Sequence, residues 1–130
     1  MSANDAGAIV RNVLAADATV AAAVGSRIYP EEAPDEADLP LIVYGVRLAE
    51  QVDGTAPIWP ARVDVHIYSH VDDQAQAVAV AADAALAGLG GYSNGTWLRC
   101  LVLDQWEEVR DFTENVWGRL LTYSGMVLRS

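Results

Sequence analysis

The segment from Ala61 to Leu89 constrains the fold most, because two different apolar periodicities follow one another within it. In its first part, branched apolar residues alternate with polar ones, which is typical of a strand with one buried face. In its second part, apolar residues recur at spacings of three and four, as on an amphipathic helix. The strand residues are Val63, Val65 and Ile67, and the helix residues are Ala75, Val78, Ala79, Ala82, Leu86 and Leu89. We expect this strand and helix to pack together and organise the core.

The helix of this unit is predicted to run from Asp72 to Leu89. Asp72 and Asp73 lie in its first turn, where the positive end of the helix dipole favours carboxylates. Glycines at 88, 90 and 91 end it, since glycine adopts the left-handed conformation common after a helix.

The remaining chain contributes one more helix and three more strands to the prediction. The first helix spans Asn4–Ala16, and Asp17 is expected to cap a short turn that ends at Gly25. With the strand already described, at Ala61–His70, the predicted strands are Leu41–Glu50, Ala61–His70, Trp97–Glu108 and Trp117–Arg129. A hairpin turn is predicted over Gln51–Ala56. Pro57 and Pro60 argue against a regular central strand at Ile58 and Trp59. The third strand is expected to alternate, with Leu98, Cys100, Val102 and Asp104 on one face and Leu101, Leu103 and Gln105 on the other.

These elements predict an α+β fold formed by one domain over residues 1–130. Its sheet is four-stranded and mainly antiparallel, and the N-terminal helix and the central helix (Asp72–Leu89) pack on one face. The order of elements is α-β-β-α-β-β. Between the first helix and the first strand, Arg27–Pro30 is expected to be extended. The stretch Glu31–Asp38 carries five carboxylates and is interpreted as a solvated loop that orders on docking.

Charge and composition limit the classes of partner. All eight basic residues are arginines scattered singly, and the net charge is −10, which argues against a nucleic-acid backbone as the main partner. No apolar run approaches the ~20 residues that span a bilayer, and the N-terminus lacks the positive region of a secretory signal. A single cysteine, Cys100, excludes an intrachain disulfide and a cysteine-based metal site. We expect a protein made in a reducing cytoplasm, with no membrane partner.

Candidate catalytic and metal-binding groups have plainer structural interpretations. Asp64, His66 and Tyr68 share one face of a strand, where a carboxylate could orient a histidine base, but such neighbours are common on exposed sheet faces. His70 with Asp72 and Asp73 lacks the spacing of known metal sites, so helix capping by the carboxylates is favoured. Cys100 alternates with apolar residues and is interpreted as a buried small hydrophobe. We expect no enzymatic activity, no cofactor and no metal.

The tryptophans point instead to assembly. Trp59, Trp97, Trp106 and Trp117 all lie near strand ends or loops, and tryptophan is enriched in protein interfaces. The alternative is that two or more of them close the ends of the core. Together with the polar strand face, they give a set of candidate assembly-contact residues: Trp59, Asp64, His66, Tyr68, Trp106 and Trp117.

The ordered set of segments resembles the tail-completion, or tail-terminator, proteins of long-tailed bacteriophages and related particles. The resemblance runs from the first helix through Leu14–Asp17, Val24–Tyr29 and the proline-flanked Leu39–Tyr44. It is clearest in Val63–Ser69 with the alanine-rich helix that follows, and it ends with Gly118–Leu128.

This resemblance implies a subunit that assembles as a homo-oligomeric ring, typically a hexamer, at the head-proximal end of a tail tube within a virion. Such a ring stops polymerisation of the tube protein and presents a surface to the head-tail connector protein, while DNA passes through its lumen. The resemblance brings no catalytic residues. Two alternatives are another neck or baseplate component of the same virion, and a small ligand-binding or catalytic α+β domain that uses the face of Asp64 and His66.

Overall fold

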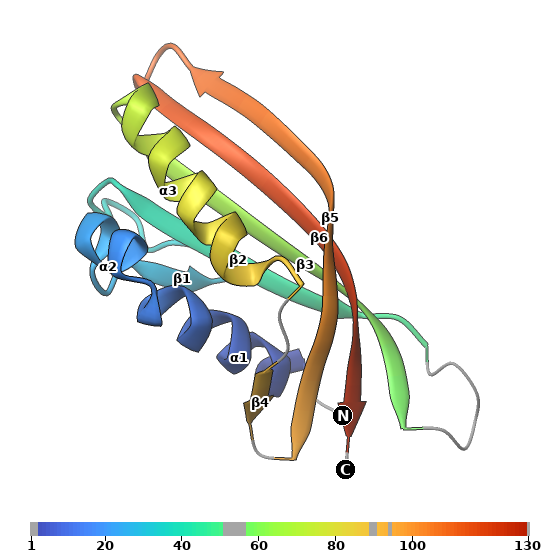
Figure 1. Cartoon of the computed structure of the whole chain (residues 1–130). Coiled ribbons are helices and arrows are strands. Elements are labelled where there is room, and N and C mark those ends of the chain that lie inside the picture. The colour runs from blue at the N-terminus through green and yellow to red at the C-terminus, as the bar shows by residue number, and fades with distance from the viewer. Residues whose placement is uncertain (1–2, 51–56, 89–90, 94, 130) are drawn as a thin grey trace.

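The computed structural model describes residues 3–50, 57–88, 91–93 and 95–129. These residues form a six-stranded sheet with three helices on one side (Figure 1). The elements in chain order are α1 (Ala3–Ala16), α2 (Ala18–Val24), β1 (Ile28–Pro30), β2 (Leu41–Leu48), β3 (Ile58–Ser69), α3 (Asp72–Leu86), β4 (Gly91–Ser93), β5 (Thr96–Asp111) and β6 (Val116–Arg129). Across the sheet the order is β1-β2-β3-β6-β5-β4, with β1 parallel to β2 and the other neighbours antiparallel.

The predicted four-stranded sheet in the order α-β-β-α-β-β is therefore wrong. The sheet gains β1 and β4, and the short turn after Asp17 is a third helix, α2. β1 and β4 are three residues long, so neither is long enough to show a period of two. Each is a strand because a longer neighbour offers its backbone groups, as where Ile28 lies beside Ile42 of β2. A parallel edge pair makes the sheet mixed.

Ile58 and Trp59 belong to the sheet, so the prediction that Pro57 and Pro60 exclude a strand there is wrong. β3 begins at Ile58, which pairs with Leu128 of β6. The Pro60 carbonyl accepts a hydrogen bond from the Ala49 N–H at 2.9 Å, so the nitrogen of Pro60 also faces β2. Pro60 lies just beyond the paired part of β2, so the N–H group that proline lacks costs little stability there. The residues on either side of Pro60 pair with β6.

The helices and the inner face of the sheet form the core. Val63, Val65 and Ile67 are fully buried, and Val78 and Ala82 of α3 pack in the same cluster, so the predicted faces of this strand and helix are confirmed. The whole buried stripe of α3 is Ala75, Val78, Ala79, Ala82 and Leu86. Small alanine side chains let the helix axis approach the sheet closely, and α1 covers the neighbouring strands (Figure 1).

α3 ends at Leu86 rather than at Leu89, which lies outside the described residues. Ala87 is extended and Gly88 has a φ of 70°, in the left-handed region. The Gly88 N–H donates to the Leu101 carbonyl of β5 at 2.8 Å. The chain is therefore hydrogen-bonded to the sheet two residues after the helix ends.

β5 does not alternate as expected. Leu98 and Leu101 are both buried although they lie three positions apart, because the register with β6 shifts between Arg99 and Val102. A second shift follows between Leu103 and Gln105. Such bulges bend a strand, and β5 and β6 curve along their length as the sheet curls into an open half-barrel (Figure 1). The side chain of Cys100 and the predicted turn at 51–56 lie outside what the structure describes.

Among the described helices, none is by itself long and apolar enough to cross a membrane. α1 and α2 pass that test only when taken together, and they meet at an angle of 90°.

Candidate assembly surface

The sheet has a second face, which the described helices do not cover. Alternation along β3 and its neighbours brings Asp64, His66 and Tyr68 to this open face, and all three are half-buried. His66 pairs in register with Val43 of β2 on one side and with Leu120 of β6 on the other. The open face therefore mixes polar and apolar side chains, as a surface that contacts another protein does.

The three polar residues of β3 form no hydrogen bond with one another. Asp64 contacts Arg62 at 3.4 Å and accepts a hydrogen bond from the Thr122 hydroxyl at 3.3 Å, rather than bonding to His66. The His66 and Tyr68 rings meet edge to face, with centroids 6.3 Å apart. Burial raises the pKa of the Tyr68 hydroxyl above its ordinary value of 10.0. A base needs an orienting partner within hydrogen-bond reach, and His66 has none among the described residues.

A groove of about 420 Å³ crosses this face, and we call it the acidic groove. It is lined by Glu31, Glu32, Ala33, Leu39, Leu41, Val43, His66, Tyr68 and Val116. Its floor is mainly apolar, and both carboxylates come from the loop that follows β1. A smaller cleft of about 90 Å³ shares Glu31, Val43 and His66 with it and extends to Asp64 and Arg47. The loop after β1 thus turns a flat sheet face into a concave one.

The loop begins from an anchored and strained position. Glu31 has a φ of 64°, which is unfavourable for a residue with a Cβ, and its N–H donates to the Tyr44 carbonyl at 2.8 Å. Its carboxylate lies over Gly45, where an added Cβ would come within 3.3 Å of Glu31 Oε1. Glycine at position 45 therefore leaves the space that this carboxylate occupies.

None of the three candidate tryptophans lines the groove. Trp59 pairs with Val127, which is in the core, and Trp106 packs partly against the core from β5. Trp117 pairs with Ser69 near the end of β3. The structure thus brings Asp64, His66 and Tyr68 together on the open face and places the three tryptophans elsewhere.

A second surface lies at the turn between β5 and β6. Sequence reasoning pointed to one of its residues, Trp117, and missed the other two, Arg110 and Phe112. The Arg110 guanidinium stacks on two rings, 4.3 Å from the centroid of Phe112 and 4.0 Å from that of Trp117. Phe112 is 77% exposed. We call Arg110, Phe112 and Trp117 the hairpin tip. The available sequence signal was an arginine and two aromatic residues close to the break between the predicted strands Trp97–Glu108 and Trp117–Arg129.

Local hydrogen bonds hold the turn of the hairpin in place. Asp111 Oδ1 accepts from the N–H groups of Thr113 and Glu114, at 2.9 and 3.1 Å, as in an Asx turn. His70 Nδ1 lies 2.9 Å from the Asn115 carbonyl oxygen, which ties the turn to the end of β3. The turn that carries the tip is therefore held in a defined conformation.

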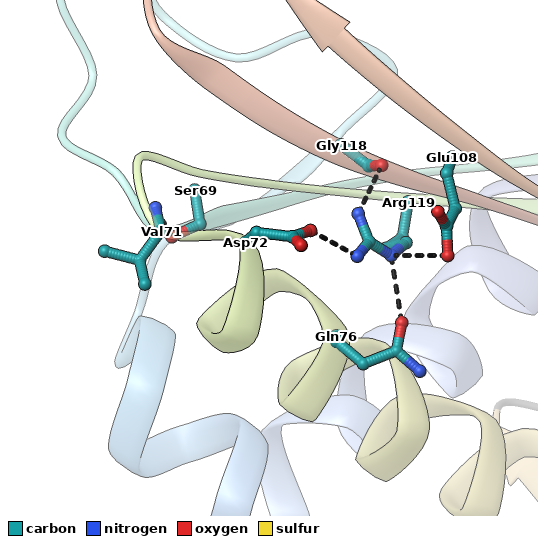
Figure 2. Close-up of polar contacts among 7 residues, drawn as sticks. All are labelled: Ser69, Val71, Asp72, Gln76, Glu108, Gly118 and Arg119. Carbon is teal, nitrogen blue, oxygen red and sulfur yellow. Dashed lines mark hydrogen bonds and ion pairs between the residues drawn. The ribbon is translucent and has the colours of Figure 1, made fainter.

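Arg119 of β6 is buried and has several polar partners (Figure 2). One of them is Asp72, which the sequence predicts to cap α3. The Arg119 side chain is only 4% exposed and donates to Asp72 Oδ1, to Gln76 Oε1 at 3.0 Å and to the Gly118 carbonyl at 3.2 Å. Glu108 Oε1 of β5 lies 3.6 Å from Nε. α3 has no side-chain cap at its N-terminus, so the capping interpretation is wrong. The cluster joins α3 to the β5–β6 hairpin.

The described residues contain no group of three or more histidine, cysteine, aspartate or glutamate side chains that could hold a metal ion. His70 contacts Asn115 and Asp72 contacts Arg119, so the two residues have separate partners.

Comparison with known proteins identifies the type of molecule to which this open face and projecting hairpin belong. A family model described as Tail completion protein gp17 matches residues 8–126, nearly the whole length of the chain. The chain belongs to the tail-completion family. The resemblance seen in the sequence is thereby confirmed.

Solved structures agree with this assignment. A chain from the virion of a native gene transfer agent particle is 25% identical, with a TM-score of 0.80, and the match covers 98% of this chain and 99% of that one. A second solved chain is 14% identical with a TM-score of 0.62, covers 100% and 96% of the two chains, and shows a shared fold alone. No curated protein matches the chain. This member of the tail-completion family is a structural protein of a phage-type tail, and so a virion component.

Proposed function

We propose that this tail-completion protein caps the head-proximal end of the tail tube as a ring. The ring ends polymerisation of the tube protein and offers its opposite side to the head-tail connector protein. The match to the tail-completion family over residues 8–126 carries this proposal. The likeness to a chain of a gene transfer agent virion supports the same setting.

The charge of the chain suits a channel for DNA. Each subunit has a net charge of −10, and phosphate backbones bind to clustered cations. Arginines on the open face are separated by carboxylates, as where Arg62 pairs with Asp64. A ring of such subunits repels DNA from its wall, so DNA passes through the lumen without being held.

Tube growth tests this proposal. Tubes grown from the tail tube protein of the same particle are imaged by electron microscopy, with and without the purified protein. We expect elongation to stop after addition, with one ring at one end of each tube. Unchanged tube lengths would contradict the role of terminator. Binding along the tube wall, or only at the end distant from the head, would indicate a different tail or baseplate component.

A further inference from the structure

The hairpin tip and the acidic groove are unlike surfaces on one chain, and their chemistry is complementary. The tip presents an exposed phenylalanine ring beside a guanidinium group. The groove presents an apolar floor with the carboxylates of Glu31 and Glu32 at its edge. An aromatic anchor in a pocket, next to a cation that faces carboxylates, is a common pattern at the centre of protein interfaces.

The charge of the chain restricts which contact two copies can make. Subunits with a net charge of −10 repel one another in most orientations, so a stable contact has to bring a cation to carboxylates. Several arginines are already occupied, since Arg119 pairs with Asp72, Arg62 pairs with Asp64, and Arg27 donates to the Pro40 carbonyl. Arg110 is exposed, stacks on two rings and forms no ion pair with the described residues.

The tip does not occupy the groove of its own chain. Val116, at the base of the hairpin, lines the groove, yet Phe112 four residues earlier remains 77% exposed. The turn that carries Phe112 is closed by Asp111 and tied to His70, so the ring is held away from the groove. Groove and tip are therefore both available to other copies.

We infer that the hairpin tip of one copy docks in the acidic groove of the next, with Phe112 on the apolar floor and Arg110 facing Glu31 and Glu32. This inference rests on the proposed ring, because a contact between two different patches is head-to-tail and generates a closed ring when its rotation closes. The partner that this surface takes is a second copy of the chain.

Two charge reversals on opposite sides of the contact test the inference. Arg110→Glu makes the tip repel the groove, and Glu32→Arg makes the groove repel the tip. Assembly is measured by sedimentation velocity and native mass spectrometry, alone and with tail tubes. Each variant alone is expected to weaken self-association by at least about tenfold, because like charges then face each other. Phe112→Ala is expected to weaken it at least as much.

Mixing the two variants gives the sharpest result. In an equimolar mixture, the reversed tip of one variant meets the reversed groove of the other, and the two native surfaces also meet. We expect rings to return, with the two variants in equal numbers. Arg99→Glu is the matched control, because Arg99 stacks on Trp97 at 4.5 Å on the same strand, far from the tip, and it is expected to assemble normally.

The outcomes separate this contact from the proposed function. If the wild type caps tubes and the single variants cap them equally well, the tip-to-groove contact is overturned and the terminator role stands. If the wild type forms rings that the variants lose and the mixture restores, but tubes ignore these rings, the contact stands and the terminator role fails. A wild type that stays monomeric with and without tubes overturns both.

Discussion

At the scale of single residues, buried polar groups tie distant elements of this protein together. Arg119 of β6 contacts α3 through Asp72 and Gln76, and it contacts β5 through Glu108 (Figure 2). Tyr123 of β6 donates its hydroxyl to Asp83 of α3 at 2.9 Å. Both residues lie on the core side of the sheet, where a lost partner leaves a polar group with little access to water.

Asp72→Ala is expected to lower the free energy of unfolding by about 1–3 kcal/mol, because Arg119 loses one charged partner while buried. Asp73→Ala is the matched control, since Asp73 is exposed in the same first turn and has the same relation to the helix dipole. Urea denaturation of both variants measures the difference. An equal loss of unfolding free energy in both variants would show that the ion pair of Asp72 with Arg119 adds no stability beyond the interaction of Asp72 with the helix dipole.

Alkaline pH is expected to destabilise the fold through its buried tyrosines. Burial and the hydrogen bond to Asp83 raise the pKa of Tyr123 far above its ordinary value of 10.0, and burial also raises the pKa of Tyr44. Above about pH 10 the unfolded chain loses these protons while the folded chain keeps them, so the free energy of unfolding falls as pH rises. Below pH 10 this contribution is fully present.

Tyr123→Phe tests this pH dependence. The variant is expected to be less stable near neutral pH, because Asp83 loses a donor, but to lose less further stability between about pH 9 and pH 11. Tyr92→Phe is the control, because the Tyr92 side chain is exposed at the sheet edge. Thermal unfolding across this pH range gives the comparison. Parallel curves for wild type and Tyr123→Phe would exclude Tyr123 as the cause.

At the scale of elements, α3 and the sheet are joined by small apolar side chains, and this makes the helix face sensitive to size and charge. Ala82→Glu is expected to destabilise the fold by more than about 4 kcal/mol, since it buries an unpaired charge at a position that is fully buried. Ala84→Glu on the exposed side of the same helix is expected to change stability by less than about 0.5 kcal/mol. Circular dichroism melts compare them, and a folded Ala82→Glu would show that the helix face is assigned wrongly.

At the scale of the whole molecule, one face of the sheet packs against the helices and the other is left uncovered by the described helices. Asp64→Ala is expected to fold normally, because Asp64 is half-buried on the open face, and to weaken assembly on tail tubes. Asp73→Ala lies on the helix side and should assemble like the wild type. Electron microscopy of tube ends counts the capped fraction. Equal capping by both variants would remove Asp64 from the set of assembly contacts.

Much of the architecture was predictable because it depends on local periodicity. The buried faces of β3 and α3 followed from Val63, Val65 and Ile67 and from the spacing of Val78 and Ala82. The open-face location of His66 followed from the same alternation, since neighbouring residues of a strand point to opposite faces.

The rest was decided by contacts between segments far apart in sequence. Ile28 belongs to a strand only because Ile42 lies beside it, and Leu101 is buried because β6 shifts register against β5. The acidic groove exists because the loop after β1 brings Glu31 over Gly45, and Arg119 is buried because α3 supplies Asp72. The sequence alone determined which residues could face a core, because periodicity is local. The tertiary structure decided which polar and edge groups found partners, because those partners lie many residues away.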